Sequence, residues 1–433
     1  MKFPFRNHPG YGLKDASTFP TGGPMDLTAH VEKQFLKGSQ RICAASDTLA
    51  RILPLKHEFG ITRLANVTGL DSVGLPVVIA VRPNARSIAI SQGKGMTLAH
   101  AKASALMEAI EIWHAERIDM PVFYASIADL EARHCFVDLD RLPQTPHPRP
   151  HRTERQHWVT AFDILSGRDK LVPFEMVHAD YTHPVSPEAG RYPASTNGLA
   201  SGNHLLEAIC HGICEVAERD ALAIWHARPI EAQRDSRLDP GSIEDAALQA
   251  SLGKFKRAGL DCAIWDVTCD TGVPSFLSIV FDPGAQADHL GLGSGTHPDP
   301  TIALHRALNE AAQTRLNYIS GAREDLFHDE YSAEGRQAKA QAFEDLLIGS
   351  TGERRFDEVA GATNRTLGED LAWLKNCLKG AGIEEIAVVD LTHADFEIPV
   401  VRVIIPGLEA PHDDVAYVAG PRAVQVQNES AGS

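Results

Sequence analysis

Three segments of the chain share one order of hydrophobic and polar positions: a β-rich start, a polar turn carrying Asp, then Pro and a β-branched run. They read NVTGLDSVGLPVVIAVRP from Asn66, DVTCDTGVPSFLSIVFDP from Asp266 and DLTHADFEIPVVRVIIPG from Asp390. Runs of Val, Ile and Phe bounded by Asp, Gly and Pro are typical of strands and turns. Each segment predicts a hairpin with a buried second strand. Together they indicate a weak internal repeat, with chance similarity of strand-turn-strand units as the alternative.

Alanine-rich apolar segments follow glycine-bearing loops at three places. The loop SQGKGMT (91–97) precedes a predicted helix over 97–117, STNGLASGN (195–203) one over 204–226, and GLGSGTHPDP (291–300) one over 301–319. No copy of the hairpin stands directly before the second loop. Because strands and helices mix without strict βαβ alternation, the chain predicts an α+β fold of layered sheets and helices.

The other segments give less regular patterns. A helix is predicted around 29–51 and a polar helical stretch over 330–380. Residues 139–157 are rich in Pro, Arg and His, which is typical of an exposed loop or linker that could also hold an acidic peptide. The tail after Gly420 shows no regular pattern and is expected to be unstructured.

Each of the three apolar helices carries two oxygen-bearing side chains spaced three residues apart, so that both lie on one helix face. The pairs are Glu108 with Glu111, Glu215 with Glu218, and Glu310 with Gln313. Glutamate pairs usually lie on solvated faces, but helices this apolar on all sides are usually buried. A buried carboxylate needs a cation, and few lysines or arginines stand on these helices. Oxygen ligands favour Mg²⁺ over zinc.

Magnesium sites of this kind usually accompany a nucleotide, because Mg²⁺ keeps waters and takes substrate phosphates as ligands. The loops fit that role: Gly93-Lys94-Gly95 offers close backbone approach and a positive charge, and Asn197-Gly198 and Gly202-Asn203 offer amide groups at a helix start. Neither a Walker A pattern nor a G-x-G-x-x-G after a strand is present. The residues alone therefore predict a nucleotide and Mg²⁺ site between helices.

Composition and charge exclude some classes of function. The chain has 57 acidic and 41 basic residues, and its net charge of −16 disfavours nucleic-acid binding, which depends on phosphate contacts. It lacks a membrane-span pattern of about 18 uncharged apolar residues and the apolar run of a signal peptide. We therefore expect a cytoplasmic protein without a membrane or nucleic-acid partner. Seven scattered cysteines without a Cys-x-x-Cys pair indicate buried thiols rather than a zinc site.

Three runs together resemble the YcaO superfamily over roughly residues 60–410: SQGKGMTLAHAKASALMEAIE, NGLASGNHLLEAICHGICEVAERDA and ALHRALNEAAQTRLNYISGARED. The resemblance implies an enzyme that binds ATP and Mg²⁺ and phosphorylates a peptide amide oxygen after a nucleophile has added to the carbonyl carbon. It also implies a catalytic domain at 60–410, with an arm and helix at 1–60 and a tail at 411–433.

The family's motifs place site residues on this sequence but name no catalytic residue. By resemblance, Mg²⁺ is held by Glu108, Glu111, Glu215, Glu218 and Glu310. The nucleotide is contacted by Lys94, Ser104, Glu108, Asn203, Glu207, Arg219, Gln313, Arg315 and Arg323. The arginine that commonly follows the first motif is Ile112 here, which leaves one phosphate contact unaccounted for.

The product depends on the nucleophile, and thioamide formation is expected. Azoline-forming members commonly end in a P-x-P-x-P tail, which the end of this sequence lacks, and residues 390–409 look like members that work beside a TfuA partner with a sulfur donor. An azoline-forming cyclodehydratase is one alternative. The others are an ATP-binding accessory protein for ribosomal protein methylthiolation and a structural role with the glutamates paired to arginines. A homodimer is the default assembly.

Overall fold

Three antiparallel hairpins stand where the sequence repeats itself. The structure is a computed structural model that describes residues 25–36, 38–185, 189–284, 290–348, 352–414 and 416–431. In it, β3 (Arg63–Asn66) pairs with β4 (Val77–Val81), β10 (Asp261–Asp266) with β11 (Ser275–Phe281), and β13 (Ala387–Asp390) with β14 (Val400–Ile404). The second strand of each hairpin is buried, which confirms the prediction.

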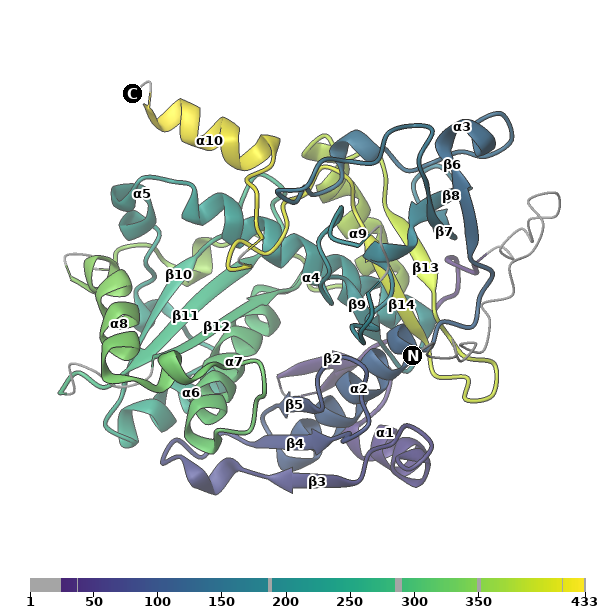
Figure 1. The fold of residues 1–433 in the computed structure, drawn as a ribbon. Helices are drawn as coiled ribbons and strands as arrows, with labels where there is room; N and C mark the ends of the chain where they lie inside the picture. The colour runs from purple at the N-terminus through teal and green to yellow at the C-terminus, as the bar shows by residue number, and fades with distance from the viewer. Residues whose placement is uncertain are drawn as a thin grey trace, which may run out of the picture.

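Each hairpin gains a third antiparallel strand that leads into a long helix (Figure 1). β5 (Ile90–Lys94) joins β4 and precedes α2 (Leu98–Glu116), and β12 (Gly291–Thr296) joins β11 and precedes α7 (Pro300–Ser320). The third hairpin pairs through β14 with β9 (Leu199–Ser201), which precedes α4 (Leu205–His226). The second glycine-bearing loop therefore lacks a preceding hairpin because its hairpin comes from the far end of the sequence.

The three long helices begin and end within one residue of their predicted bounds. All three have a side chain as N-cap: a hydrogen bond is accepted by Thr97 from the backbone of His100 before α2, by His204 from Leu206 before α4, and by Asp299 from Thr301 before α7. Such caps satisfy amide groups that the first turn leaves without a partner. Local patterns of this kind are visible in the sequence, so the bounds were predictable.

The glycine-bearing loops contain strands, and some of their glycines pack against the long helices, whereas Gly95 and Gly202 line the cavity described below. A Cβ atom at Gly93 would lie 2.0 Å from the Ala105 nitrogen, and one at Gly293 would lie 2.2 Å from the Ala307 carbonyl oxygen. These glycines therefore allow β5 and β12 to pack directly on the small-residue faces of α2 and α7. Lys94 remains available to the site through its side chain.

Two other predictions were wrong. The helix expected over 29–51 is confined to α1 (Ala45–Ile52), after the short hairpin β1 (Gln34–Leu36) and β2 (Ser39–Arg41). The tail after Gly420 forms α10 (Pro421–Ala431) because tertiary contacts hold its start. Glu409 accepts hydrogen bonds from the backbone of Gly420 and Ala423, and Arg422 pairs with buried Asp220 at 2.9 Å.

The remaining elements complete the layers around these units. β6 (Phe123–Ser126), β7 (Arg155–Asp163) and β8 (Arg168–Pro173) extend the third sheet, in the order β6-β7-β13-β14-β9 with β8 on β7. The other helices are α3 (Ile127–Leu130), α5 (Ile230–Asp235), α6 (Ala246–Arg257), α8 (Ala333–Leu347) and α9 (Leu367–Gly380). Single 3₁₀ turns lie at Leu53–Leu55, Thr68–Leu70, Leu139–Arg141, Phe174–Met176, Pro240–Ser242, His328–Tyr331 and Phe356–Glu358.

Two other expectations can be compared with this arrangement. The polar stretch over 330–380 is only partly helical, since the described residues 352–366 before α9 contain only the 3₁₀ turn Phe356–Glu358 as helical structure. Of the seven cysteines, which are free thiols, Cys135 is exposed, whereas Cys210, Cys214 and Cys269 are buried as predicted. Within the described ranges, no helix has the length and apolar character needed to cross a membrane.

Candidate functional site

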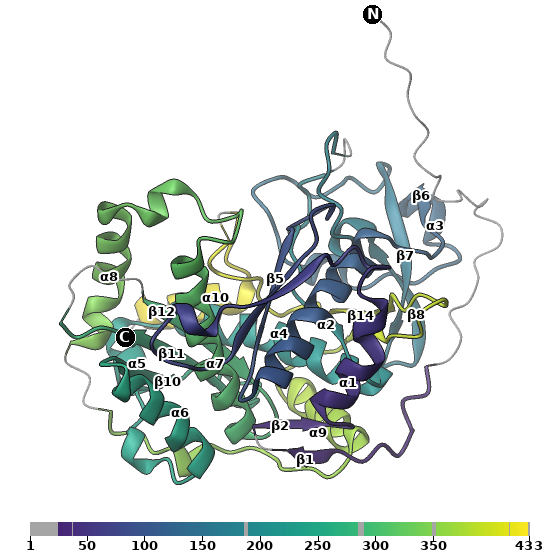
Figure 2. The ribbon, with the colours of Figure 1, turned by 90° about the horizontal axis from the view of Figure 1, so that it is seen from below.

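A cavity of about 580 Å³ lies between α2, α4 and α7, the helices that carry the glutamate pairs. Figure 2 shows α7, α4 and α2 near one another across the centre of the view. Each of the three strand-and-helix units supplies one wall, and the β1–β2 turn closes another side. A site built in this way exists only when all three units are folded together.

Most residues expected at the site line this cavity. They are Lys94, Ser104, Glu108, Glu111, Asn203, Glu207, Glu215, Glu218, Arg219, Glu310, Gln313 and Arg323. Arg315 does not line it. Its side chain is buried and its Nε pairs with Asp71 at 3.0 Å, so this arginine holds α7 to the turn after β3.

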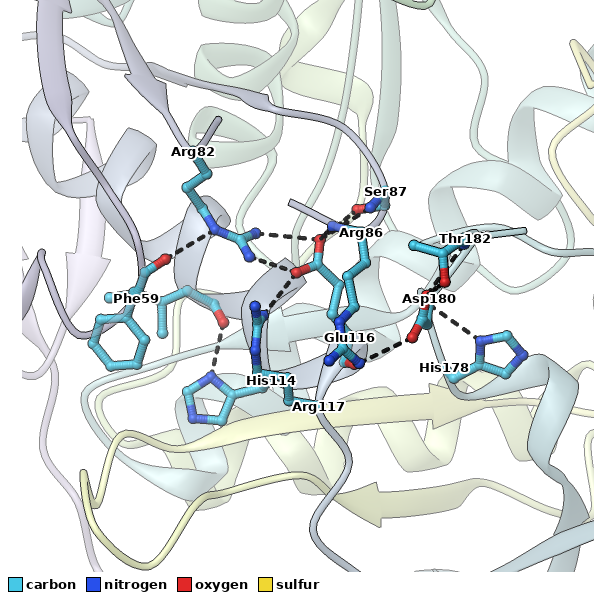
Figure 3. Close-up of polar contacts among 11 residues, drawn as sticks. Phe59, Arg82, Arg86, Ser87, His114, Glu116, Arg117, His178, Asp180 and Thr182 are labelled. Atoms are coloured by element: carbon cyan, nitrogen blue, oxygen red, sulfur yellow. Dashed lines mark hydrogen bonds and ion pairs between the residues drawn. The ribbon is translucent and has the colours of Figure 1, made fainter. Parts of the chain in front are cut away.

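Helix α2 carries glutamates of two kinds. One is paired within the fold, and the others face the cavity. Glu116 is completely buried and accepts hydrogen bonds from the guanidinium groups of Arg82 and Arg117, from Ser87 and from the backbone of Arg86 (Figure 3). This carboxylate is fully paired within the fold. It is the arrangement that a purely structural explanation of the glutamates requires.

Glu108, Glu111 and Glu215 lack such partners. Glu108 accepts a hydrogen bond from the Gln92 backbone at 3.1 Å, and Glu111 accepts two from Ser201, at 2.8 Å from the backbone and 2.6 Å from the hydroxyl. None of the three forms an ion pair with a lysine or arginine in the described part of the chain. They therefore face the cavity as carboxyl groups whose ionised forms are not neutralised by an ion pair among the described residues.

Burial raises the pKa of these carboxyls. The pKa of Glu111 rises to about 8 because burial disfavours its charged form, against the hydrogen bonds from Ser201 and with added repulsion from Glu108 and Glu215. Burial raises the pKa of Glu215 to about 7, although Arg219 opposes the shift. Glu108 shifts in the same direction for the same first cause. A bound cation would reverse this cost, because it favours the ionised form.

The other wall combines carboxylates with cations. Lys94 Nζ lies 2.6 Å from Glu310 Oε2, and the Ser294 hydroxyl donates to Glu218 Oε1 at 2.7 Å. Arg219 Nη1 lies 3.7 Å from Glu218 Oε1. Burial opposes ionisation of Glu310, but Lys94 and Arg219 outweigh it and lower its pKa. Lys94 and Arg219 thus bring positive charge to one end of a carboxylate-lined cavity.

The donor set fits Mg²⁺ with a phosphate ligand better than a metal held by protein alone. Across the described residues, no three Asp, Glu, His or Cys side chains converge closely enough to hold a metal ion by themselves. Mg²⁺ is commonly bound through one or two carboxylates, with waters and substrate phosphates completing its shell. On α7 the side-chain oxygens of Asn309, Gln313 and Asn317 are buried without a hydrogen-bond partner. Glu108, Glu111, Glu215, Glu218 and Glu310 are therefore the residues that would hold the ion.

Sequence reasoning missed the contribution of the N-terminal arm. Arg41 pairs with Glu207 at 3.0 Å, and the Thr48 hydroxyl donates to Asn203 Oδ1 at 3.0 Å, so two motif residues are held by the segment before residue 60. Both arm residues line the cavity, as does Arg306 of α7. No motif spacing in the sequence could have identified the arm residues or Arg306 as part of the site. Ile112 also lines the cavity and supplies no charge there.

Comparison with known proteins decides the family. The profile described as YcaO cyclodehydratase, ATP- and Mg²⁺-binding, matches residues 92–409. This chain belongs to the YcaO family. YcaO proteins bind ATP and Mg²⁺ and activate backbone amides of peptide substrates in an ATP-dependent reaction.

Relatives resemble this YcaO protein along most of its length. A protein of Rhizobium leguminosarum bv. trifolii, described as uncharacterized and in the tfuA 3′ region, is 36% identical over 392 residues, which cover 89% of this chain and 92% of that protein. An uncharacterized protein of Methanothermobacter thermautotrophicus is 33% identical over 386 residues, covering 87% and 95% of the two chains.

Solved structures share the fold. YcaO from Methanopyrus kandleri bound with AMPPCP and Mg²⁺ has a TM-score of 0.70 at 23% identity and covers 90% of this chain and 98% of its own. A heterocyclase in complex with substrate and cofactor has a TM-score of 0.72 at 24% identity, covering 88% of this chain and 54% of its own. This YcaO protein thus spans about half the length of that heterocyclase. The α+β architecture expected from the sequence is confirmed.

Proposed function

We propose that this YcaO protein converts a backbone amide of a peptide into a thioamide, with hydrosulfide as the nucleophile and ATP as the activating substrate. The observation that carries the proposal is the match, over nine-tenths of both chains, to the Rhizobium protein in the tfuA 3′ region. A gene neighbour of that kind supports a TfuA-like partner, and a sulfur donor is proposed beside it. A homodimer is proposed as the assembly.

The cavity residues have distinct roles in this proposal. Glu108, Glu111, Glu215, Glu218 and Glu310 hold Mg²⁺, which when bound neutralises phosphate charge. Lys94 and Arg219 attract the phosphates, and Ser104, Asn203, Glu207, Gln313 and Arg323 line the same nucleotide cavity. Phosphoryl transfer needs positioning and charge neutralisation more than covalent chemistry by the protein. The carboxylates of the cavity suit binding of Mg²⁺, and its cationic end suits binding of phosphate.

The proposed reaction balances without an oxidant or reductant. Hydrosulfide sulfur bonds to the amide carbon, and the carbonyl π electrons move to the amide oxygen. That oxygen then bonds to the γ-phosphorus of ATP as the bond between the γ-phosphorus and its bridging oxygen breaks and ADP leaves. Finally the C–O bond breaks, the C=S bond forms, and phosphate departs with the amide oxygen and the S–H proton.

Mass spectrometry of a reconstituted system tests the product. The peptide encoded beside the gene, the TfuA-like neighbour, Mg²⁺-ATP and sodium sulfide are incubated with the protein. The proposal expects a mass gain equal to the exchange of one oxygen for one sulfur, dependent on both ATP and sulfide. The Glu218→Gln variant is the matched inactive control, because it loses a proposed Mg²⁺ ligand and keeps the side-chain shape.

Two other outcomes would overturn the thioamide assignment. Loss of one water without a need for sulfide identifies azoline formation. ATP-dependent stabilisation of the protein with an unchanged peptide mass in the complete system favours the accessory role. In either case the nucleotide site stands, because its test is the binding of Mg²⁺-ATP itself.

A further inference from the structure

A second, smaller cavity of about 30 Å³ lies beside the nucleotide cavity. Its walls come from the segment 195–197, from Val216 of α4, from β14 and from the segment 408–411. A water molecule needs about 10–15 Å³ of such space, so one or two small molecules fit. Most of the lining is apolar, and Arg402 is the cation among its residues.

Arg402 is buried and forms no ion pair with the residues that the structure describes. Its side chain lies on β14 in a residue only 3% exposed, and its Nη2 donates to the Ser195 carbonyl oxygen at 2.6 Å. Its Nε and Nη1 are buried and, in the described part of the chain, have no hydrogen-bond partner. A buried guanidinium that is not neutralised costs several kcal/mol. The buried guanidinium therefore favours the binding of an anion in this cavity.

Glu409 is the carboxylate that lines this cavity, and its oxygens accept hydrogen bonds from other groups. Glu409 accepts hydrogen bonds from the Tyr417 hydroxyl at 3.0 Å and from the backbone of Gly420 at 2.7 Å and Ala423 at 3.0 Å. These contacts fold the C-terminal segment onto α4 and leave Glu409 without a described ion pair to Arg402. The Glu215 carboxylate acts on Arg402 electrostatically from the nucleotide cavity. Glu215 is also a proposed Mg²⁺ ligand, so when the ion is bound, a further negative charge for Arg402 has to come from a bound group.

A second unsatisfied atom defines what that group must offer. Asn197 Oδ1 lines the same cavity and is buried without a partner. Arg402 requires an acceptor and Asn197 requires a donor, so the ligand that satisfies both is a small anion that still carries one hydrogen. Hydrosulfide has this property, whereas a water molecule satisfies the hydrogen bonds and leaves the charge of Arg402 uncompensated.

The small cavity shares a thin wall with the nucleotide cavity. Ser195 and Asn197 line the small one, and Thr196 between them lines the large one. On α4, Val216 faces the small cavity and Glu215 faces the large one. A ligand held at Arg402 is thus stored within one residue's thickness of the site where the amide is activated.

We propose that this cavity is a subsite for a small monovalent anion and that the anion bound during turnover is hydrosulfide. The first half of the proposal stands on the cavity and on Arg402. The second half rests on the proposed thioamide function and extends it by assigning a place to the nucleophile.

Anion binding is tested without reference to the reaction. Crystals soaked in sodium bromide should show an anomalous peak beside Arg402, and sodium bromide should raise the Tm of the wild-type protein more than sodium methanesulfonate, whose anion is too large for the cavity. Arg402→Met removes the charge and fills similar volume, so it should fold and lose the bromide effect. A refined water with no bromide beside Arg402 would overturn the subsite.

Kinetics test the identity of the anion. In the reconstituted reaction, Arg402→Met should raise the KM for sulfide roughly ten- to hundredfold, the factor expected for a hydrogen bond to a charged group. The KM for ATP should stay unchanged, and Arg402→Lys should recover part of the sulfide affinity. An unchanged KM for sulfide in Arg402→Met would refute the assignment. If the wild-type protein forms no thioamide while bromide still binds, the proposed function fails and the anion subsite stands.

Discussion

Glu111 and Glu116 lie on the same helix but differ in how many hydrogen-bond donors surround their carboxylates. Glu116 is surrounded by donors from Arg82, Ser87 and Arg117. Among the described residues, Glu111 accepts hydrogen bonds only from the hydroxyl and backbone N–H of Ser201. A carboxylate in the first situation contributes to folding, because removing one partner of a buried pair leaves the other charge uncompensated. A carboxylate in the second situation costs folding energy until a cation arrives.

This contrast predicts different effects for two matched substitutions. Glu111→Gln should make the metal-free protein more stable than wild type at pH 8, because burial raises the pKa of Glu111 to about 8 and the neutral amide avoids the cost of ionising it. The same substitution should abolish the stabilisation by Mg²⁺-ATP, which is roughly 2.7 kcal/mol at 100 times the dissociation constant. Glu116→Gln should cost about 3–5 kcal/mol and keep the Mg²⁺-ATP increment. Thermal and denaturant unfolding with and without Mg²⁺-ATP measure both. Full retention of the increment in Glu111→Gln would show that Glu111 is not a ligand.

His114 gives a prediction for acid stability. Burial lowers its pKa from 6.5 to about 4, while its Nδ1 lies 2.8 Å from the Ile110 carbonyl oxygen and its ring contacts Phe59 and Trp113. The unfolded chain therefore binds this proton more tightly than the folded one. The stability that depends on neutral His114 is complete above pH 6.5 and is lost as the pH falls towards 4.

The loss from this residue should reach about 3 kcal/mol at pH 4. His114→Phe cannot take up the proton, so its free energy of unfolding should fall less steeply between pH 6.5 and 4.5 than that of wild type. Urea unfolding at several pH values measures the two slopes. Equal slopes would mean that His114 is not held neutral by the fold.

At the scale of elements, local sequence patterns predicted the bounds of the helices, whereas the pairing of strands far apart in the sequence could not be predicted. The bounds of α2, α4 and α7 follow from caps and apolar runs that any short window of sequence contains. By contrast, β9 pairs with β14 from the far end of the sequence, and the bond from Arg402 to Ser195 joins residues 207 positions apart. The helix at the C-terminus was missed for the same reason, since its anchors are Asp220 and Glu409. Motif spacing found the carboxylates, but Arg41 and Arg402 reach their sites through tertiary packing alone.

The glycines of β12 illustrate how element packing sets the site. Gly291, Gly293 and Gly295 alternate along the strand, and a Cβ on each would meet α7 backbone atoms at 2.5 Å, 2.2 Å and 2.1 Å. The strand carries Ser294, which contacts Glu218, and the helix carries Glu310. The close approach that the glycines permit therefore fixes the distance between two of the proposed Mg²⁺ ligands.

Gly293→Ala should force β12 and α7 apart, with an overpacking cost of about 1–3 kcal/mol or more and a weaker affinity for Mg²⁺-ATP. Gly380→Ala is the matched control: it ends α9, has no atom within 4 Å of the added Cβ, and should be neutral or stabilising. Thermal unfolding and nucleotide titration of the two variants compare the effects. Wild-type affinity in Gly293→Ala would show that the ligand geometry does not depend on this contact.

For the whole molecule, the site is the place where three repeated units meet. Each unit brings one long helix and one glutamate pair or Glu-Gln pair to the cavity, and the hairpin of one unit is contributed from the end of the sequence. Like charges from different units face one another there, as the mutual effects of Glu111 with Glu215 and of Glu218 with Glu310 on their pKa values indicate. Without a cation, ionisation of these carboxyls would thus create electrostatic repulsion between units at the centre of the molecule.

Mg²⁺-ATP should therefore stabilise the contacts between units rather than one element. Hydrogen exchange is expected to slow together in α2, α4 and α7 on addition of Mg²⁺-ATP, because opening of any one helix away from the cavity would break the bound complex. α3, which lies on the β6–β7 edge and contributes nothing to the cavity lining, serves as an internal reference and should change little. In Glu215→Gln the protection should be lost from all three helices at once. Protection confined to a single helix would contradict a nucleotide site shared by the three units.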